Sequence, residues 1–307
     1  MPSPSSPSPQ TLPVTVVIPA YNREGLVGRA VASALAQSPN PPDEILVVDD
    51  ASSDETAAAA ELAGATVIRH TTNGGEGAAR NTAIRAARNE WVALLDSDDE
   101  WLPHHLATLW HQRRNHVLVA SSAITEGAPN GENYLVGHRS TKPAILTSPI
   151  QVILPFNPIP ASGVLAHAPT VLSAGGFRPL NRCADLDMWI RMLERGTALL
   201  SPTPGYRYHL HADQVSGDQR LMREARRDLV ASYRGATWWD PSLLKTLDAY
   251  SAWDAARQRS RHPLGWVPPL VREVTARPKS AIDIAKLLRS RRLLKRRMRD
   301  ATSRRRN

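Results

Sequence analysis

Glu90-Trp-Val-Ala-Leu-Leu-Asp-Ser-Asp-Asp-Glu-Trp101 is the stretch that decides the fold, because an apolar run ends there at Asp96, Asp98 and Asp99. The short, continuous run 91–95 is typical of a strand buried in a sheet. Like charges at the tip of a buried strand are costly unless a counter-charge is supplied. Carboxylates are the ligands of Mg²⁺ and Mn²⁺, often together with substrate phosphates. A solvated acidic loop that caps the next helix would have the same sequence. A metal site and a capping loop are therefore both open interpretations at this point.

The residues around this stretch alternate between short apolar runs and amphipathic segments. We expect strands at residues 13–19, 44–50, 66–69 and 91–95, and helices at 24–37, 54–63 and 76–87. This β-α alternation predicts an α/β fold with a Rossmann-like, mostly parallel sheet flanked by helices. Ligands of such sheets bind at the carboxyl ends of the strands. Tyr21, Asp50 and Asp96 follow three of these ends, so we expect one pocket to collect them.

The pattern is less regular after residue 109. We expect a strand at 117–124, a Pro-rich loop at 149–160, a helix at 185–195, a strand or loop with two histidines at 206–217, and helices from about 222 onward, including 251–261. The predicted organisation is a disordered segment (1–12), one α/β domain (13–220) with halves 13–110 and 111–220, a helical extension (221–285) and a basic amphipathic tail (286–307).

Composition and charge exclude several classes of protein. An apolar content of 42% suits a globular chain. The sequence has no uncharged apolar run of about 18 residues, so we expect no membrane span. The single cysteine, Cys183, rules out an internal disulfide and suits the cytosol. The N-terminal ten residues lack the basic start and apolar core of a secretory signal.

The net charge of +9 belongs to the C-terminal tail. Residues 286–307 contain 11 Lys or Arg and one Asp, whereas residues 1–285 contain 27 basic and 28 acidic side chains. A nearly neutral body makes a nucleic-acid-binding domain an unfavourable interpretation. Leucines between the tail's charges favour contact with anionic lipid head groups, although a solvated charge run explains the tail as well.

A glycine-rich loop, Gly74-Gly-Glu-Gly-Ala-Ala-Arg80, leads into the third expected helix. It lacks the dinucleotide fingerprint, because Arg80 stands where a Gly or Ala is needed and the loop follows the third strand rather than the first. A forked, permanent cation such as Arg80 suits a diphosphate. Asp50 can accept a hydrogen bond from a base N–H, and Tyr21 can stack on a base or pack at a loop. Asp185 opens a helix, where it serves either as a cap or as a general base.

Together these motifs resemble family 2 glycosyltransferases of the GT-A fold. The resemblance covers residues 13 to about 217. It is strong over the first 100 residues, and it rests on the following segments: Val17-Ile-Pro-Ala-Tyr-Asn22, Ile45-Leu-Val-Val-Asp-Asp-Ala-Ser-Ser-Asp54, Asn73 with Gly75, Ala79-Arg80-Asn81, Leu95-Asp-Ser-Asp-Asp99, Gly175-Gly-Phe177 and Asp185-Leu-Asp-Met-Trp189.

The resemblance implies a role for each matching residue. Pro19, Tyr21 and Asp50 would hold the nucleotide base, usually uracil, and Arg80 would meet the nucleotide or its diphosphate. Asp96 and Asp98 would form the Asp-X-Asp element, with Asp98 the main ligand of Mn²⁺ or Mg²⁺ and Asp96 facing ribose or metal. Asp185 would be the base of an inverting transfer, although Ala184 replaces the Glu that precedes it in the family. His211 would approach the diphosphate and the metal, with His209 as a rival.

The expected activity is therefore transfer of one sugar from a nucleotide donor, UDP-linked by resemblance, to a glycan, lipid-linked or small-molecule hydroxyl. The expected location is the cytoplasm, with peripheral contact at the inner membrane face through the tail. One alternative is a GT-A-like binding protein that has lost activity, which only Ala184 favours. Another is a sugar nucleotidyltransferase, which would need a Gly- and Arg-rich loop after the first strand. Residues 19–24 are Pro-Ala-Tyr-Asn-Arg-Glu and lack that loop.

Overall fold

The computed structural model describes residues 11–127, 135–138, 140–154, 157–211 and 218–259. Contacts divide the chain into one unit that ends at Asp218 and a second that begins at Gln219. Residues 1–10 of the expected disordered segment 1–12 and the whole of the expected basic tail lie outside the described residues. Leu12, the last residue of that segment, instead begins the first strand. Among the described residues, no helix is both long and apolar enough to cross a bilayer.

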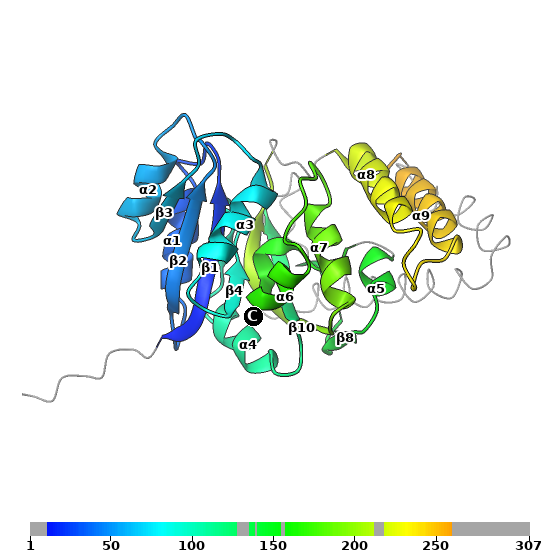
Figure 1. Cartoon of the computed structure of the whole chain (residues 1–307), viewed down its shortest axis with the longest axis horizontal. Coiled ribbons are helices and arrows are strands. Elements are labelled where there is room, and N and C mark those ends of the chain that lie inside the picture. The colour runs from blue at the N-terminus through cyan, green and yellow to red at the C-terminus, as the bar shows by residue number, and fades with distance from the viewer. Residues whose placement is uncertain (1–10, 128–134, 139, 155–156, 212–217, 260–307) are drawn as a thin grey trace, which may run out of the picture. The chain divides into compact units, whose positions relative to one another are not determined.

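The donor-side part of the first unit has the expected alternation. Its elements are β1 (Leu12–Ala20), α1 (Val27–Leu35), β2 (Pro42–Asp49), α2 (Thr56–Leu62), β3 (Thr66–Arg69), α3 (Glu76–Ala86), β4 (Trp91–Leu94), β5 (Glu100–Trp101) and α4 (His105–Gln112). Strands β3, β2, β1 and β4 lie side by side and parallel, as Figure 1 shows. β1 is apolar and almost fully buried, because helices cover the sheet. The predicted α/β class with a parallel, helix-flanked sheet is confirmed.

The remaining elements of the first unit extend the same sheet with mixed directions. They are β6 (Leu118–Glu126), β7 (Leu135–Val136), β8 (Ala144–Leu146), α5 (Ile150–Ile153), the 3-10 turn η1 (Ala161–Gly163), β9 (Val164–His167), α6 (Ala168–Ser173), α7 (Ala184–Leu193) and β10 (Ala198–His209). The strand order is β3-β2-β1-β4-β9-β6-β10-β5. β9 runs antiparallel to both β4 and β6, whereas β10 is parallel to β6. Helices α3, α6 and α7 follow one another on the near face in Figure 1.

Three expectations from the sequence are corrected by this arrangement. The acidic stretch after β4 does not cap the next helix, because β5 intervenes and α4 begins only at His105. The Pro-rich loop contains the short helix α5. β9 was not anticipated, although it joins the two halves of the sheet.

The second unit contains α8 (Gln219–Ser232) and α9 (Ser242–Arg259), which pack against each other. Leu229 and Val230 of α8 and Leu243 and Leu247 of α9 are buried. The apolar side chains of α8 recur at helical spacing, which explains why it forms one face of a helix pair. The expected helical extension is thus helical over its described part.

Candidate active site

The carboxyl ends of β1, β2 and β4 meet at one edge of the sheet, as the sequence predicted. Ala20 pairs with Asp49 at the end of β2, and Val17 pairs with Leu94 at the end of β4. Tyr21 and Asp96 follow immediately and therefore share this edge. Tyr21 is 46% exposed, so its ring is available to a ligand. Pro19 is buried within β1, where it can shape the site only through the backbone.

Asp50 is a buried carboxylate that braces the glycine-rich loop. It accepts hydrogen bonds from the backbone N–H groups of Gly74 (3.0 Å) and Gly75 (2.7 Å). His70 Nδ1 lies 2.7 Å from Asp50 Oδ1, and His70 Nε2 lies 3.0 Å from Thr82 Oγ1 on α3. Gly75 adopts a φ of +83°, which an L side chain rarely adopts. The structure therefore places Asp50 at the expected edge, with its oxygens engaged by the loop.

Arg80 is a buried cation at the centre of an acidic group. Its Nη2 donates to Asp96 Oδ1 at 2.6 Å and also to Glu76 of the same helix. The Glu76 side chain is 57% exposed, so solvent screens its charge. Partial desolvation, with the carboxylates of Asp96 and Asp185 nearby, raises the pKa of Glu76. Arg80 thus holds Asp96 in place and supplies a permanent positive charge at this edge of the sheet.

The other two carboxylates after β4 have different surroundings. Asp98 Oδ2 lies 2.9 Å from His211 Nε2. His211, which the sequence favoured over His209, is thus the histidine beside the predicted metal ligand. Asp99 is 1% exposed and accepts hydrogen bonds from Ser162 Oγ (2.5 Å) and the backbone N–H of His209 (3.1 Å). Burial, together with Asp96, raises the pKa of Asp99 well above its usual value. The rival histidine, His209, instead contacts Glu100 at 2.9 Å.

The first turn of α7 carries Asp185 toward this group. Burial raises the pKa of Asp185, while the Leu186 backbone N–H and Arg80 oppose that effect. The side-chain amide of Asn157 donates to Asp185 Oδ2 at 2.8 Å. The residue before α7, Cys183, is buried and adopts a φ of +61°. Asp185 is therefore a partly buried carboxylate with a raised pKa, as a general base requires.

The segment Gly175–Arg178 ties α3 to α7 beneath the site. Asn81 on α3 forms two hydrogen bonds with the backbone of Phe177, at 2.7 and 2.8 Å. The Phe177 ring lies 5.4 Å from the Arg80 guanidinium carbon and 6.2 Å from the Trp189 ring on α7. Gly176 has a φ of +68°, and a Cβ there would lie 2.5 Å from Asn81 Oδ1. The two helices that carry Arg80 and Asp185 are thus fixed to one segment.

A buried ion pair completes this support. Asp187 is fully buried, and Arg191 binds it through Nε (2.9 Å) and Nη2 (2.5 Å). Arg191 Nη1 also donates to the carbonyl oxygens of Ala174 (2.6 Å) and Gly176 (2.7 Å). This network locks the first turns of α7 to the segment that contacts α3.

The residues present fit a divalent cation that shares its coordination with substrate. Within the described part of the chain, no three His, Cys, Asp or Glu side chains gather as a complete metal cage. Asp98 and His211 nevertheless meet, with Asp96 two residues from Asp98. Mg²⁺ typically binds one or two carboxylates and completes its shell with water and substrate phosphates. A two- or three-ligand protein site therefore suits a metal that arrives with a nucleoside diphosphate.

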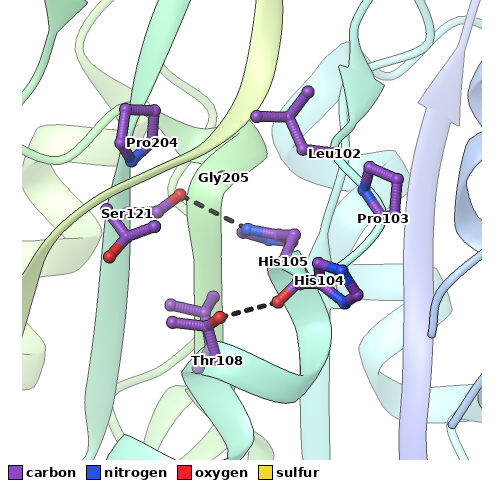
Figure 2. A pocket seen from close by; sticks show the side chains of 10 residues that line it. Leu102, Pro103, His104, His105, Thr108, Ser121, Pro204 and Gly205 are labelled. Atoms are coloured by element: carbon purple, nitrogen blue, oxygen red, sulfur yellow. Dashed lines mark hydrogen bonds between the residues drawn. The ribbon is translucent and has the colours of Figure 1, made fainter. Parts of the chain in front are cut away.

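A cavity of about 300 Å³ lies beside the start of α4 and shares no residue with the site above. Figure 2 shows His105 facing Ser121, with 3.4 Å between Nδ1 and Oγ. Burial lowers the pKa of His105 to about 3, so the ring is neutral. No carboxylate lines this cavity, which excludes it as the place of the predicted metal and base.

The sequence identified most of these side chains but missed Glu76, His70 and Asn157, and it gave no role to Asn81. Each of them contacts a predicted site residue or the segment beneath it. Glu76 could have been found, because it lies one helical turn before Arg80. The contact between Asn157 and Asp185 spans 28 residues and leaves no local pattern.

Comparison with known proteins places this geometry in a family. Residues 15–159 match the family model described as glycosyl transferase family 2. A succinoglycan biosynthesis protein of Rhizobium meliloti, ExoW, is 47% identical over 104 residues, which are 30% of this chain and 31% of that protein. A β-1,3-glucosyltransferase of Escherichia coli, WfaP, is 26% identical over 221 residues, 69% of this chain and 84% of that protein. The match thus spans about a third of the first of these relatives and most of the second.

Solved structures share the fold at low sequence identity. Staphylococcus aureus TarS, solved with UDP-GlcNAc, superposes with a TM-score of 0.59 at 18% identity, covering 84% of this chain and 79% of that one. The mannosyltransferase PcManGT of Pyrobaculum calidifontis, solved with GDP-Man and Mn²⁺, gives a TM-score of 0.55 at 19% identity, covering 92% and 88%. The match over residues 15–159 identifies this part of the chain as a glycosyl transferase family 2 domain, and the solved structures share its fold.

Proposed function

We propose that the chain transfers a single sugar from a nucleoside diphosphate sugar to a hydroxyl acceptor with inversion, using Asp185 as the base. The observation that carries this proposal is the convergence on one sheet edge of Asp98 with His211, Arg80 with Asp96, and Asp185. Cationic groups can stabilise a departing diphosphate, and a carboxylate can take the proton of an attacking hydroxyl, so this combination suits glycosyl transfer.

The chain's own residues divide the work in this proposal. Tyr21 offers an exposed ring for the nucleotide base, and Asp50 braces the glycine-rich loop through the N–H groups of Gly74 and Gly75. Arg80 opposes the charge that develops on the departing diphosphate. Asp185 takes the acceptor proton as the new glycosidic bond forms and the bond from the anomeric carbon to the diphosphate breaks. With no separate protein nucleophile, a single displacement inverts the anomeric centre.

Asp98, Asp96 and His211 would hold a divalent cation in this site. When bound, Mn²⁺ or Mg²⁺ supplies positive charge that stabilises the leaving diphosphate. UDP is the nucleotide of the donor that we propose, because TarS was solved with UDP-GlcNAc on a similar fold and the relative WfaP is named for UDP-Glc. The acceptor class we propose is a glycan or lipid-linked hydroxyl, since relatives are named for polysaccharide biosynthesis. The cytoplasmic location and the membrane contact of the tail remain predictions.

A donor-binding screen tests this function. We expect UDP-glucose or UDP-GlcNAc to raise the melting temperature only when Mn²⁺ or Mg²⁺ is present, because the cation joins the diphosphate to the protein. A ligand at 100 times its Kd stabilises the folded state by about 2.7 kcal/mol, which makes the rise measurable. Asp98→Ala should abolish the metal-dependent part of the rise, because it removes the carboxylate beside His211. Glu61→Ala, at an exposed carboxylate on α2, is the matched control and should keep the full rise.

The same screen separates the alternatives. Metal-dependent release of UDP from the sugar nucleotide supports an active enzyme, whereas binding without release points to the impaired protein that Ala184 suggests. A response to GDP-mannose alone would replace the UDP assignment. Binding that survives intact in Asp98→Ala would remove that residue from the metal site.

A further inference from the structure

Asn157 forms two directed hydrogen bonds that fix its side-chain amide. Its Nδ2 donates to Asp185 Oδ2 at 2.8 Å, and its Oδ1 accepts from the backbone N–H of Ile159 at 3.0 Å. Each end of the amide thus has a partner of the right polarity. The donor end can therefore face only the carboxylate of Asp185.

The loop that carries Asn157 is anchored to the helix that carries Asp185. Ile159 is fully buried, and its carbonyl oxygen accepts from Trp189 Nε1 at 3.0 Å. Trp189 is itself buried, one turn after Asp185 on α7. Asn157 and Asp185 therefore have a common rigid support, which a positioning contact requires.

The charges around Asp185 explain why a neutral donor suits this place. Arg80 and Glu76 of α3 and Asp96 after β4 all act on the Asp185 carboxylate. A second carboxylate beside it would favour a shared proton, which blocks a base. An amide donor orients one oxygen without adding charge. Ala184, which occupies the family's Glu position, supplies no polar group from the helix itself.

We propose that Asn157 is the positioning residue of the base: it holds Asp185 Oδ2 so that Oδ1 receives the proton of the acceptor hydroxyl. This inference rests on the proposed function of Asp185. Because Asn157 also bonds Ile159, it has a competing role as a simple support of the loop. The two roles use opposite ends of the amide, and this makes them separable by substitution.

Asn157→Asp and Asn157→Ala distinguish the two roles. The Asp variant keeps an oxygen acceptor for the Ile159 N–H and replaces only the donor that faces Asp185. If Asn157 positions the base, Asp is the worse variant: we expect kcat for release of nucleoside diphosphate to fall on the order of 10²-fold. Asn157→Ala should lose about tenfold, the worth of one hydrogen bond to a charged group. The KM for UDP-glucose, UDP-GlcNAc or GDP-mannose should stay near wild type in the Asp variant.

A carbon-13 NMR titration of the Asp185 carboxyl supplies a readout that needs no turnover. In Asn157→Asp the added carboxylate should raise the pKa of Asp185 above that of the wild type, and the acid side of the pH–rate profile should move with it. An Asp variant with wild-type kcat and an unmoved titration would overturn the inference and leave only the loop role. A wild type that releases no nucleoside diphosphate from any of the three donors would refute the proposed function, and the titration alone would then decide the placement of Asn157.

Discussion

Asp185→Asn should abolish sugar transfer while leaving nucleotide-sugar binding intact. The amide has the shape of the carboxylate, and its oxygen can still accept the hydrogen bond of Asn157, but it cannot take a proton. A missing general base costs about 10²- to 10⁴-fold in rate. Release of nucleoside diphosphate measures the loss, and calorimetric titration of the donor measures binding.

The pH dependence of the wild type gives the same residue a second test. Because burial raises the pKa of Asp185, its inactive protonated form persists to higher pH than that of a free aspartate. The rate should therefore fall on the acid side at a pH above the usual aspartate range. Asp43→Asn, at the opposite end of β2, is the control and should retain full turnover. Wild-type rates in Asp185→Asn would remove this carboxylate from the mechanism.

Arg191→Met should destabilise the first unit by about 3–5 kcal/mol, because it leaves the fully buried Asp187 without its main partner. The carbonyl oxygens of Ala174 and Gly176 lose their donor at the same time. Arg178 also approaches Asp187, at 3.2 Å, but its side chain is half-exposed and can offset only part of the loss. Urea unfolding, followed by tryptophan fluorescence to which the buried Trp189 contributes, measures the change.

The control for this substitution lies one turn further along the chain. Arg195→Met removes a partly exposed arginine whose ion pair with Glu194 is long, at 3.9 Å, and should cost less than about 1 kcal/mol. The double variant Arg191→Met with Asp187→Leu should recover part of the loss, because no buried charge remains. A loss in Arg191→Met no greater than in Arg195→Met would show that the buried pair does not stabilise the fold.

The donor-side half could be predicted because its signals are local. Apolar runs such as residues 91–95 set the parallel strands, and the polar residues that end them must meet at one edge. Tyr21 and Asp96 were found in this way, and Arg80 was found from the glycine-rich loop that leads into α3. These signals lie within short stretches of sequence, so no distant contact was needed to find them.

The fold of the acceptor half could not be predicted in the same way, because it depends on contacts between residues that are far apart in the sequence. β10 runs through Pro202 and Pro204, which normally interrupt a strand. The ladder between β10 and β6 shifts register between Leu200 and Pro204 and again between Pro204 and Tyr206, so the strand accommodates its prolines at irregular positions. The contacts of Asn157 with Asp185 and of Asn81 with Phe177 depend equally on the folded chain.

The close fit of Asn81 against Gly176 and Phe177 sets a condition for exchanging acceptor specificity between relatives. A chimaera that joins this donor half to a foreign acceptor half keeps the alignment of α3 and α7 only if the graft retains a glycine at 176, because any Cβ there would overlap the Asn81 amide. The point at which the two sequences can be joined therefore depends on Asn81 and Gly176, which are 95 residues apart in the chain, rather than on the loop between the halves. Grafts that carry both partners together should inherit a working base along with a new acceptor.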